Sequence, residues 1–185
     1  MKKEQGLKVC IVGATGLVGR TMLQVLEEHA FPMSQLLPVG SPRSVGKSVL
    51  YGGESHEVIS IEDAIIAKPH VALFSAGGEV SEKWAPQFAD AGITVIDNSS
   101  AWRMDEDCPL VVSEVNGDHI RPHHSIIANP NCTTMQLVMA LKPLHDHYRI
   151  KRGIVSTYQS ITGTGKAAIV QLEEERKGET PSAPV

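Results

Sequence analysis

A glycine-rich loop near the start of the chain constrains the fold more than any other feature. The loop, residues 13–19, reads GATGLVG and follows Leu7–Val12, a run rich in β-branched residues that predicts a strand buried on both faces. Residues 16–28 then carry apolar side chains at helical spacing. A strand, a glycine turn and a helix N-terminus in this order can bind the pyrophosphate of a dinucleotide. Because the spacing is GxxGxxG rather than GxGxxG, a tight turn with a packing glycine stays an alternative.

Apolar runs and helical patterns alternate along the first 130 residues. Strands or extended segments are predicted at 36–39, 57–60, 71–75, 93–97, 110–112 and 125–128, and helices at Ile61–Ala67 and 81–91. This alternation is typical of right-handed βαβ units and predicts an α/β fold with a doubly wound, parallel, Rossmann-like sheet. Beyond it the pattern changes to a helix at 132–147, a longer strand at 150–159, a charged helix at 166–177 and a loop at 178–185.

The turn after the second predicted strand indicates which dinucleotide is bound. NAD-binding folds usually place an acidic residue about 20 residues beyond the glycine loop, on the ribose 2′-hydroxyl. Here the turn reads Ser41-Pro42-Arg43-Ser44, and a guanidinium with two hydroxyls suits a 2′-phosphate, which favours NADP over NAD. An ordinary exposed turn is the alternative.

A second candidate cofactor turn, SAGG at 75–78, follows another predicted strand, at the edge where ligands meet such sheets. A plain strand-to-loop turn is the alternative. The cofactor contacts predicted from these turns are Gly13, Thr15, Gly16, Leu17, Val18, Ser41, Arg43, Ser44, Ser75 and Gly77.

Cys132 is the candidate nucleophile. Asn131 is a good N-cap residue, which places Cys132 in the first turn of the following helix. A helix N-terminus favours the thiolate form of a cysteine, and its backbone amides can hold an oxyanion. A packed cysteine at a helix start is the alternative, while Cys10 is expected to be an inert buried residue and Cys108 a loop residue. A thiol and a nicotinamide site in one chain suggest aldehyde oxidation through a thiohemiacetal and a thioester.

Composition excludes several other classes of function. The net charge is −4 and only 4% of residues are aromatic, so neither a basic surface nor a stacking platform for nucleic acid is present. No apolar run approaches the length of about 18 residues that a membrane span needs, and the start of the chain has no signal-peptide pattern, so we expect a cytoplasmic protein. Three cysteines without a CxxC motif, and eight histidines whose spacings match no zinc motif, predict that no metal is bound.

Five motifs together resemble those of one family. GATGLVG, SAGG, DNSSAWR, NPNCTT and QSITGTGK occur in the order and spacing of aspartate-semialdehyde dehydrogenase, and the resemblance covers essentially the whole chain. It implies NADPH-dependent reduction of 4-phospho-L-aspartate to L-aspartate-4-semialdehyde with release of phosphate, a step in lysine, methionine, threonine and diaminopimelate biosynthesis. It also implies an NADP-binding domain at residues 1–130, the start of an α+β catalytic and dimerisation domain, incomplete here, at 131–185, and a homodimer for the complete protein.

The resemblance assigns roles to individual residues. Cys132 matches the nucleophile, Gln159 the glutamine that positions the acyl group, and Arg103 the arginine that binds phosphate. Asn98 lies in the same phosphate-site loop, and Gly163 and Gly165 match a loop near the substrate and cofactor. On the residues alone, Arg103 would be a solvated loop arginine, Gln159 a strand residue, and the two glycines a turn.

Chains of this family are considerably longer and carry a general-base histidine and a carboxylate-binding arginine beyond the region that this sequence matches. We therefore expect little turnover from this chain alone, and an aggregation-prone or partner-dependent second half that exposes apolar surface. Two alternatives stay open. One is an N-acetyl-glutamyl-phosphate reductase-like enzyme, whose cysteine stands in a different local motif, and the other is a non-catalytic NADP-binding module.

Overall fold

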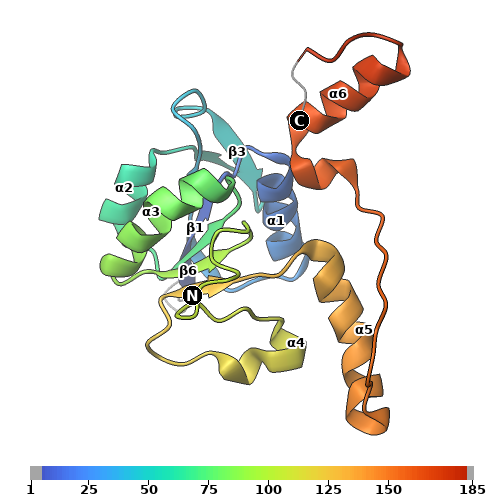
Figure 1. The fold of residues 1–185 in the computed structure, drawn as a ribbon. Coiled ribbons are helices and arrows are strands. Elements are labelled where there is room, and N and C mark those ends of the chain that lie inside the picture. The colour runs from blue at the N-terminus through green and yellow to red at the C-terminus, as the bar shows by residue number, and fades with distance from the viewer. Residues whose placement is uncertain (1–5, 183–185) are drawn as a thin grey trace.

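A five-stranded parallel sheet lies at the centre of the computed structural model, which describes residues 6–182 (Figure 1). Its strands run in the order β2-β1-β5-β6-β7, and every neighbouring pair is parallel. Their bounds are Leu7–Val12 for β1, Met33–Val39 for β2, Val71–Phe74 for β5, Thr94–Asp97 for β6 and Ile126–Ala128 for β7. The order reverses beside β1, so the connections after β1 and β5 diverge and leave a crevice at the carboxyl ends of these strands. The predicted doubly wound α/β fold is confirmed.

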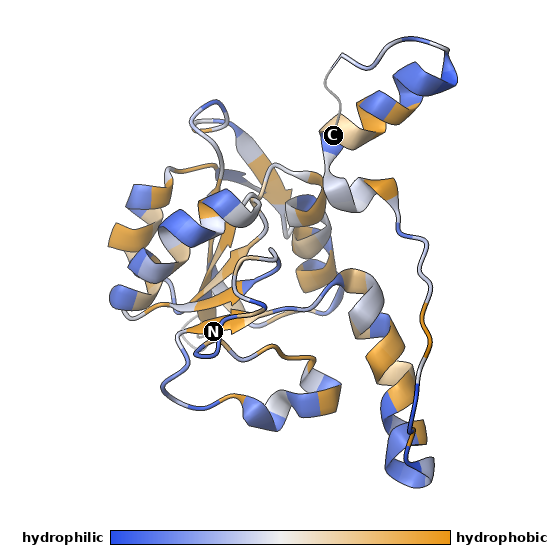
Figure 2. Cartoon of the chain, in the orientation of Figure 1, coloured by the Kyte–Doolittle hydropathy of each residue, from blue (hydrophilic) through white to orange (hydrophobic). Residues whose placement is uncertain are grey.

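Helices cover both faces of this sheet. Helix α1 (Leu17–Glu28) lies on one face, and α2 (Ile61–Ala67) and α3 (Gly78–Asp90) lie on the other (Figure 1). A core cluster forms on each face, one around Ile11 and Leu23 and the other around Phe74 and Phe88. Figure 2 shows that the strands between these helices form a hydrophobic layer. The sheet therefore has the two covered faces that continuous apolar strands require.

A two-stranded antiparallel hairpin was not predicted from the sequence. It consists of β3 (Ser48–Tyr51) and β4 (Glu54–Glu57), which pair through a Gly52–Gly53 turn with positive φ at both residues. A Gly-Gly pair is a known signal for such a turn. The sequence predicted only an extended stretch at 57–60, of which Ile59 forms an isolated bridge to Val39.

The regular structure beyond β6 is mostly helical. It contains α4 (Ser113–Asn116), a 3₁₀ turn at Gly117–His119, α5 (Cys132–Tyr148), a second 3₁₀ turn, η2 (Ile161–Thr164), and α6 (Lys166–Arg176). The predicted helices at 132–147 and 166–177 are confirmed to within two residues. The loop predicted at 178–185 is irregular as far as residue 182, and its last three residues, like the first five of the chain, lie outside the described range.

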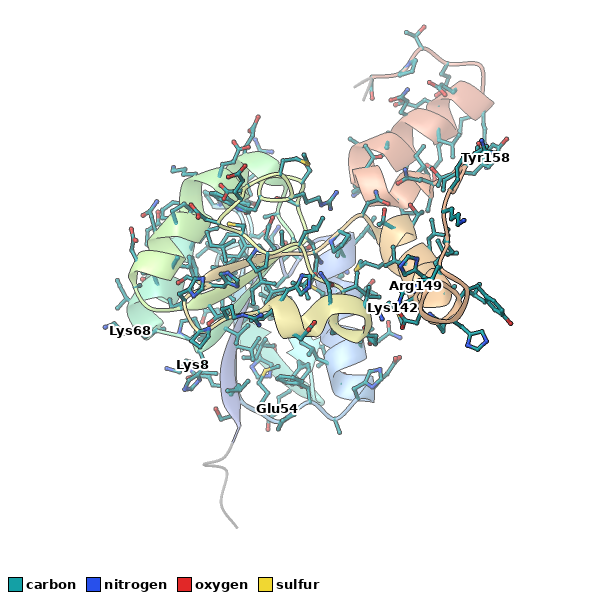
Figure 3. All side chains as sticks on the ribbon, turned by 60° about the horizontal axis from the view of Figure 1, so that its bottom comes forward. Lys8, Glu54, Lys68, Lys142, Arg149 and Tyr158 are labelled. Carbon is teal, nitrogen blue, oxygen red and sulfur yellow. The ribbon has the colours of Figure 1, made fainter. Side chains whose placement is uncertain are left out.

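Two predicted strands are wrong. Residues 110–112 form only an isolated bridge, between Leu110 and Ala128, and residues 150–159 form no strand. The second segment is exposed along its whole length because no strand of the described chain lies beside it to complete a ladder. Its apolar side chains face solvent, with Ile154 85% and Tyr158 100% exposed (Figure 3), and α5 has no fully buried residue. The expected exposure of apolar surface is therefore present, while the domain boundary at residue 130 stays a prediction.

Gly19 tests how tightly α1 packs on the glycine loop. A Cβ at this buried position would lie 2.2 Å from the carbonyl oxygen of Gly13 and 2.8 Å from the Cα of Ala14, both backbone atoms. We expect Gly19→Ala to lower the free energy of unfolding by about 1–3 kcal/mol, because the helix must shift to accept the methyl group. Urea unfolding followed by circular dichroism measures this change.

Gly117→Ala is the matched control. Gly117 has φ −57°, and a Cβ there meets no atom within 4 Å. This variant is expected to unfold like the parent chain, and a Gly19→Ala chain that does so as well would contradict the close contact.

Candidate functional site

The glycine loop passes closely over the carboxyl ends of three strands. The amide N–H groups of Gly13 and Ala14 donate to the carbonyl oxygen of Val39 at 2.9 and 3.0 Å. Gly13 has φ +93°, and a Cβ there would lie 2.7 Å from the carbonyl oxygen of Ser75. Only glycine fits at position 13. This close approach to Ser75 brings the start of α1 to the point where the sheet order reverses. The N-cap of α1 is Gly16, which has no side chain, so the first-turn amides are left for a ligand.

A cavity of about 860 Å³ lies over the N-terminus of α1. All but two of the predicted cofactor residues line it, namely Gly13, Thr15, Gly16, Leu17, Val18, Ser41, Ser75, Gly77, Gly163 and Gly165. The last two come from the QSITGTGK motif, so the structure brings residues 13–18 and 163–165 together at one site. The buried Oγ of Ser75 has no hydrogen-bond partner among the described residues, which leaves a free polar group in the wall of the cavity.

The predicted 2′-phosphate turn lies beside this cavity. The amide of Ser44 donates to the carbonyl of Ser41 at 2.7 Å, and the hydroxyl of Thr15 donates to that of Ser44 at 3.5 Å. Arg43 is exposed, and its side chain makes no hydrogen bond or ion pair with residues 6–182. Arg43 and Ser44 do not line the cavity, so a role in binding the cofactor stays a prediction for both.

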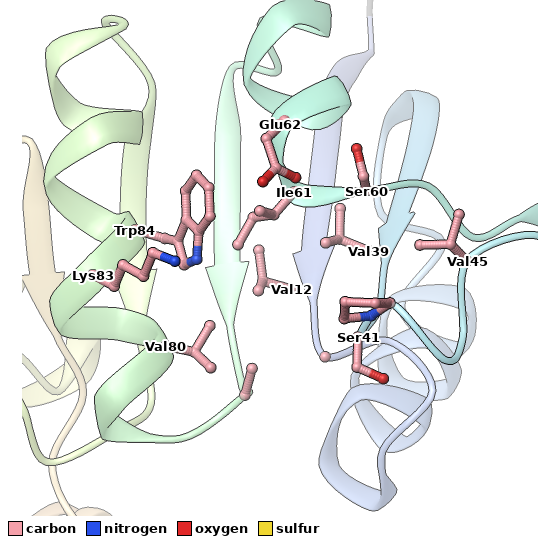
Figure 4. A pocket seen from close by; sticks show the side chains of 14 residues that line it. Val12, Val39, Ser41, Val45, Ser60, Ile61, Glu62, Val80, Lys83 and Trp84 are labelled. Carbon is pink, nitrogen blue, oxygen red and sulfur yellow. The ribbon is translucent and has the colours of Figure 1, made fainter.

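A second, apolar cavity of about 650 Å³ lies between the end of β2 and α3 (Figure 4). Val39 and Val45 face Val80 and Trp84 across it, and it shares Gly13, Ser41 and Ala76 with the first cavity. Its polar groups include Glu62 and Lys83, whose ammonium lies 4.9 Å from the centre of the Trp84 ring. An apolar slot with a few polar groups suits a flat ring system. Sequence analysis missed this slot, since it forms only where the fold places β2, α2 and α3 around one space.

Cys132 lies in the first turn of α5, directly beyond β7. The side-chain oxygen of Asn131 accepts from the amide of Thr133 at 3.0 Å and from its hydroxyl at 2.5 Å, which confirms Asn131 as the N-cap. Cys132 is exposed, whereas Cys10 is buried and Cys108 half-buried. Burial raises the pKa of the Cys10 thiol, and burial together with Asp105 raises the pKa of the Cys108 thiol to about 11. Cys132 is therefore the accessible thiol of the chain.

Gln159 lies beside this helix start although the strand predicted around it is absent. The side-chain amide of Asn131 donates to the Oε1 of Gln159 at 3.0 Å. No described residue accepts a hydrogen bond from the Nε2 of Gln159, so its N–H groups are available to a carbonyl oxygen near Cys132.

Arg103 and Asn98 belong to a network that joins the ends of β6 and β7. The guanidinium of Arg103 donates from Nε to the carbonyl of Asn129 at 2.9 Å and from Nη2 to the carbonyl of Asn98 at 3.0 Å. The side-chain amide of Asn129 donates to that of Asn98 at 2.5 Å. Two backbone carbonyls thus fix the half-buried guanidinium, and its Nη1 keeps both N–H groups for an anion.

Asn129 itself was not singled out from the sequence. The signal was available, because Asn129 directly follows a strand at the edge where ligands meet parallel sheets. It also begins the NPNC segment that carries Cys132, so one short connection supplies both the Arg103 anchor and the thiol.

Residues 6–182 contain neither a cluster of metal-ligating side chains nor a membrane-spanning type of helix. No cluster of histidine, cysteine, aspartate or glutamate there is arranged to hold a metal ion. None of the helices in this range combines the length and the apolar character that crossing a membrane requires.

Comparison with known proteins identifies similar chains. Residues 8–123 match the family described as semialdehyde dehydrogenase, NAD binding domain. An aspartate-semialdehyde dehydrogenase of Aquifex aeolicus is 51% identical over 175 residues, which cover 93% of this chain and 52% of the relative. The chain spans about half the length of the curated relatives it matches.

Solved structures of this kind are also similar. Aspartate semialdehyde dehydrogenase II of Vibrio cholerae, in complex with ASA, has a TM-score of 0.89 at 46% identity, covering 98% of this chain and 56% of that one. Aspartate semialdehyde dehydrogenase of Candida albicans, solved with NADP, has a TM-score of 0.68 at 26% identity, covering 78% of this chain and 48% of that one.

Alkylation distinguishes the three thiols. We expect iodoacetamide at about pH 8 to modify Cys132 first, because Cys132 is exposed while Cys108, with its pKa of about 11, is only about one part in a thousand thiolate there. Peptide mass spectrometry after timed quenching identifies the modified residue. In urea all three thiols should react. In the folded chain, Cys132→Ser should remove the fast reaction and leave the other two thiols unchanged. Fast modification of Cys108 in the folded chain would contradict this assignment.

Proposed function

Since this chain belongs to the semialdehyde dehydrogenase family, we propose that it supplies the cofactor site and the nucleophile of an aspartate-semialdehyde dehydrogenase. The reaction would convert 4-phospho-L-aspartate to L-aspartate-4-semialdehyde with NADPH. One observation carries the proposal. The accessible thiol of Cys132, the side chain of Gln159 and the anchored guanidinium of Arg103 lie along one sheet edge, on which the dinucleotide-sized cavity also opens.

The described residues fit NADP. The N-terminus of α1 suits the pyrophosphate, the free hydroxyl of Ser75 offers a hydrogen bond, and the apolar slot beside Trp84 suits the adenine ring. Arg43, with the hydroxyls of Ser41 and Ser44, would hold the 2′-phosphate. The similar Candida albicans enzyme, solved with NADP, supports this cofactor. When bound, NADPH supplies the hydride.

The chemistry at Cys132 follows from its surroundings. Its sulfur attacks the acyl carbonyl of the substrate, the bond from that carbon to the phosphate oxygen breaks, and a thioester forms on the chain. Arg103 holds the leaving phosphate through the free edge of its guanidinium. The amides of the first turn of α5 and the side chain of Gln159 stabilise the oxyanion. Reduction of the thioester then releases the aldehyde and returns the thiol.

Several parts of the proposal rest on the resemblance. A further portion of the protein, corresponding to the rest of its relatives' length, would supply the general base and the group that binds the substrate carboxylate. Residues 131–185 would begin the catalytic and dimerisation domain, and the complete protein would be a cytoplasmic homodimer. The product would feed lysine, methionine, threonine and diaminopimelate biosynthesis.

Activity requires the general base and the group that binds the substrate carboxylate, both of which the proposal places in the further portion. The chain alone should therefore show little turnover. We expect phosphate-dependent reduction of NADP by aspartate semialdehyde to appear when the chain is co-expressed with the C-terminal half of the Aquifex aeolicus relative. General base catalysis alone typically contributes about 10²–10⁴-fold. Absorbance of NADPH measures the rate.

Three comparisons make this assay specific. Cys132→Ala should abolish the rate, and N-acetyl-glutamate semialdehyde should be a poor substrate. A near-normal rate from the chain alone would contradict the division of groups between the two portions. A co-expressed pair with no activity would favour a non-catalytic NADP-binding module.

Arg43 tests the preference between cofactors. Arg43→Ala should weaken NADPH binding by about tenfold and leave NADH binding nearly unchanged, because only NADPH carries the 2′-phosphate. Nicotinamide fluorescence measures both dissociation constants. Lys47→Ala is the control, since Lys47 is an exposed cation four residues further on and lines neither cavity. Equal loss for both cofactors would exclude the 2′-phosphate contact.

A further inference from the structure

Trp102 directly precedes Arg103 and makes a hydrogen bond to a different layer of the fold. Its indole Nε1 donates to the hydroxyl of Ser81 at 2.8 Å. Ser81 lies on α3 with 0% exposure, and it and Asp97 are the two fully buried polar residues of the described chain. A hydroxyl buried this deeply needs a partner, and here a residue 21 positions away supplies the donor.

The loop from Asp97 to Arg103 is otherwise held by its own side chains and by the strand ends beside it, where the amide of Asn98 donates to the carbonyl of Phe74 at 3.0 Å and that of Asn129 donates to the carbonyl of Asp97 at 2.8 Å. The hydroxyl of Ser99 donates to Asp97 at 2.5 Å and accepts from the amide of Ala101 at 3.1 Å. These bonds fix the shape of the loop and its place at the strand ends, but none of them reaches the helices that cover the sheet.

The orientation of Arg103 depends on that position. One of its two anchors, the carbonyl of Asn98, belongs to the loop, and the other, the carbonyl of Asn129, belongs to the neighbouring connection. A shift of the loop therefore changes the donor angle to the carbonyl of Asn129 and the direction of the free Nη1. Trp102, the residue directly before Arg103, also packs against the core cluster that contains Phe74 and Phe88.

We infer that Trp102 is a positioning residue for the phosphate group. Its hydrogen bond to Ser81 fixes the 97–103 loop on α3, and the loop in turn aims the guanidinium of Arg103 at the phosphate. The inference rests on the proposed function for the role of Arg103. Gly77, the N-cap of α3, lines the first cavity, and Val80 of α3 lines the second, so the same helix sets the phosphate group's place relative to the cofactor site.

Binding of orthophosphate to the chain tests this inference without catalytic turnover. Isothermal titration calorimetry gives the dissociation constant for the wild-type chain and for Trp102→Phe, Ser81→Ala and the double variant. Trp102→Phe keeps an aromatic ring but has no N–H, and Ser81→Ala removes the acceptor from the other side. Thermal melts and circular dichroism show whether each variant is folded.

We expect either single variant to bind phosphate about tenfold more weakly and the double variant no more weakly than Trp102→Phe alone, because both remove the same bond. In an Arg103→Ala background, Trp102→Phe should change phosphate affinity no further, since Trp102 acts through Arg103. Tyr51→Phe is the control, because Tyr51 is a half-buried aromatic on β3, away from the loop, and losing its hydroxyl should leave phosphate affinity unchanged.

The outcomes separate this inference from the proposed function. If the wild-type chain binds phosphate through Arg103 but both single variants bind it equally well, the inference is overturned and the proposed function stands. Additive losses in the double variant, or a loss that persists without Arg103, also overturn it. If the wild-type chain binds no phosphate, the role of Arg103 fails and the inference fails with it.

Discussion

The close backbone contact between the ends of β1 and β5 is the constraint on which the rest of the site depends. Gly13 crosses within van der Waals reach of Ser75, and any side chain at Gly13 would collide with that carbonyl. Because the two strand ends stay this close, the N-terminus of α1 is held over the point where the sheet order reverses. Both cavities include Gly13 in their walls, so both take their shape from this crossing.

A network of amides performs the corresponding task farther along the same edge, at the carboxyl ends of β6 and β7. Asn98 and Asn129 each follow a strand, and their side chains bond each other while their carbonyls hold the guanidinium of Arg103. The thiol of Cys132 lies three residues beyond Asn129. Residues distant in sequence thus meet because parallel strands bring their carboxyl ends to one edge.

The sequence was sufficient to predict the elements whose apolar patterns are local. The buried strands and the helices at 132–147 and 166–177 could be predicted because each pattern refers to the element itself. The prediction of a strand at 150–159 was wrong. An alternating pattern indicates which face a strand could bury, but a strand also needs a neighbouring strand to pair with, and the pattern does not provide one. For the same reason the slot beside Trp84 and the bond from Trp102 to Ser81 could not be predicted, since both depend on contacts between separate elements.

Strand β7 lies at the end of the sheet order and has three residues, with an isolated bridge to Leu110 on its outer side. Edge elements with few bonds open at a lower free energy than the centre of a sheet. The residues proposed for acyl transfer, Cys132 and the anchors of Arg103, are attached to this edge, while the cavity over the N-terminus of α1 rests on the central strands. The two parts of the candidate site therefore differ in local stability, and mild denaturation would disturb the position of Cys132 before the crevice over α1 loses its shape.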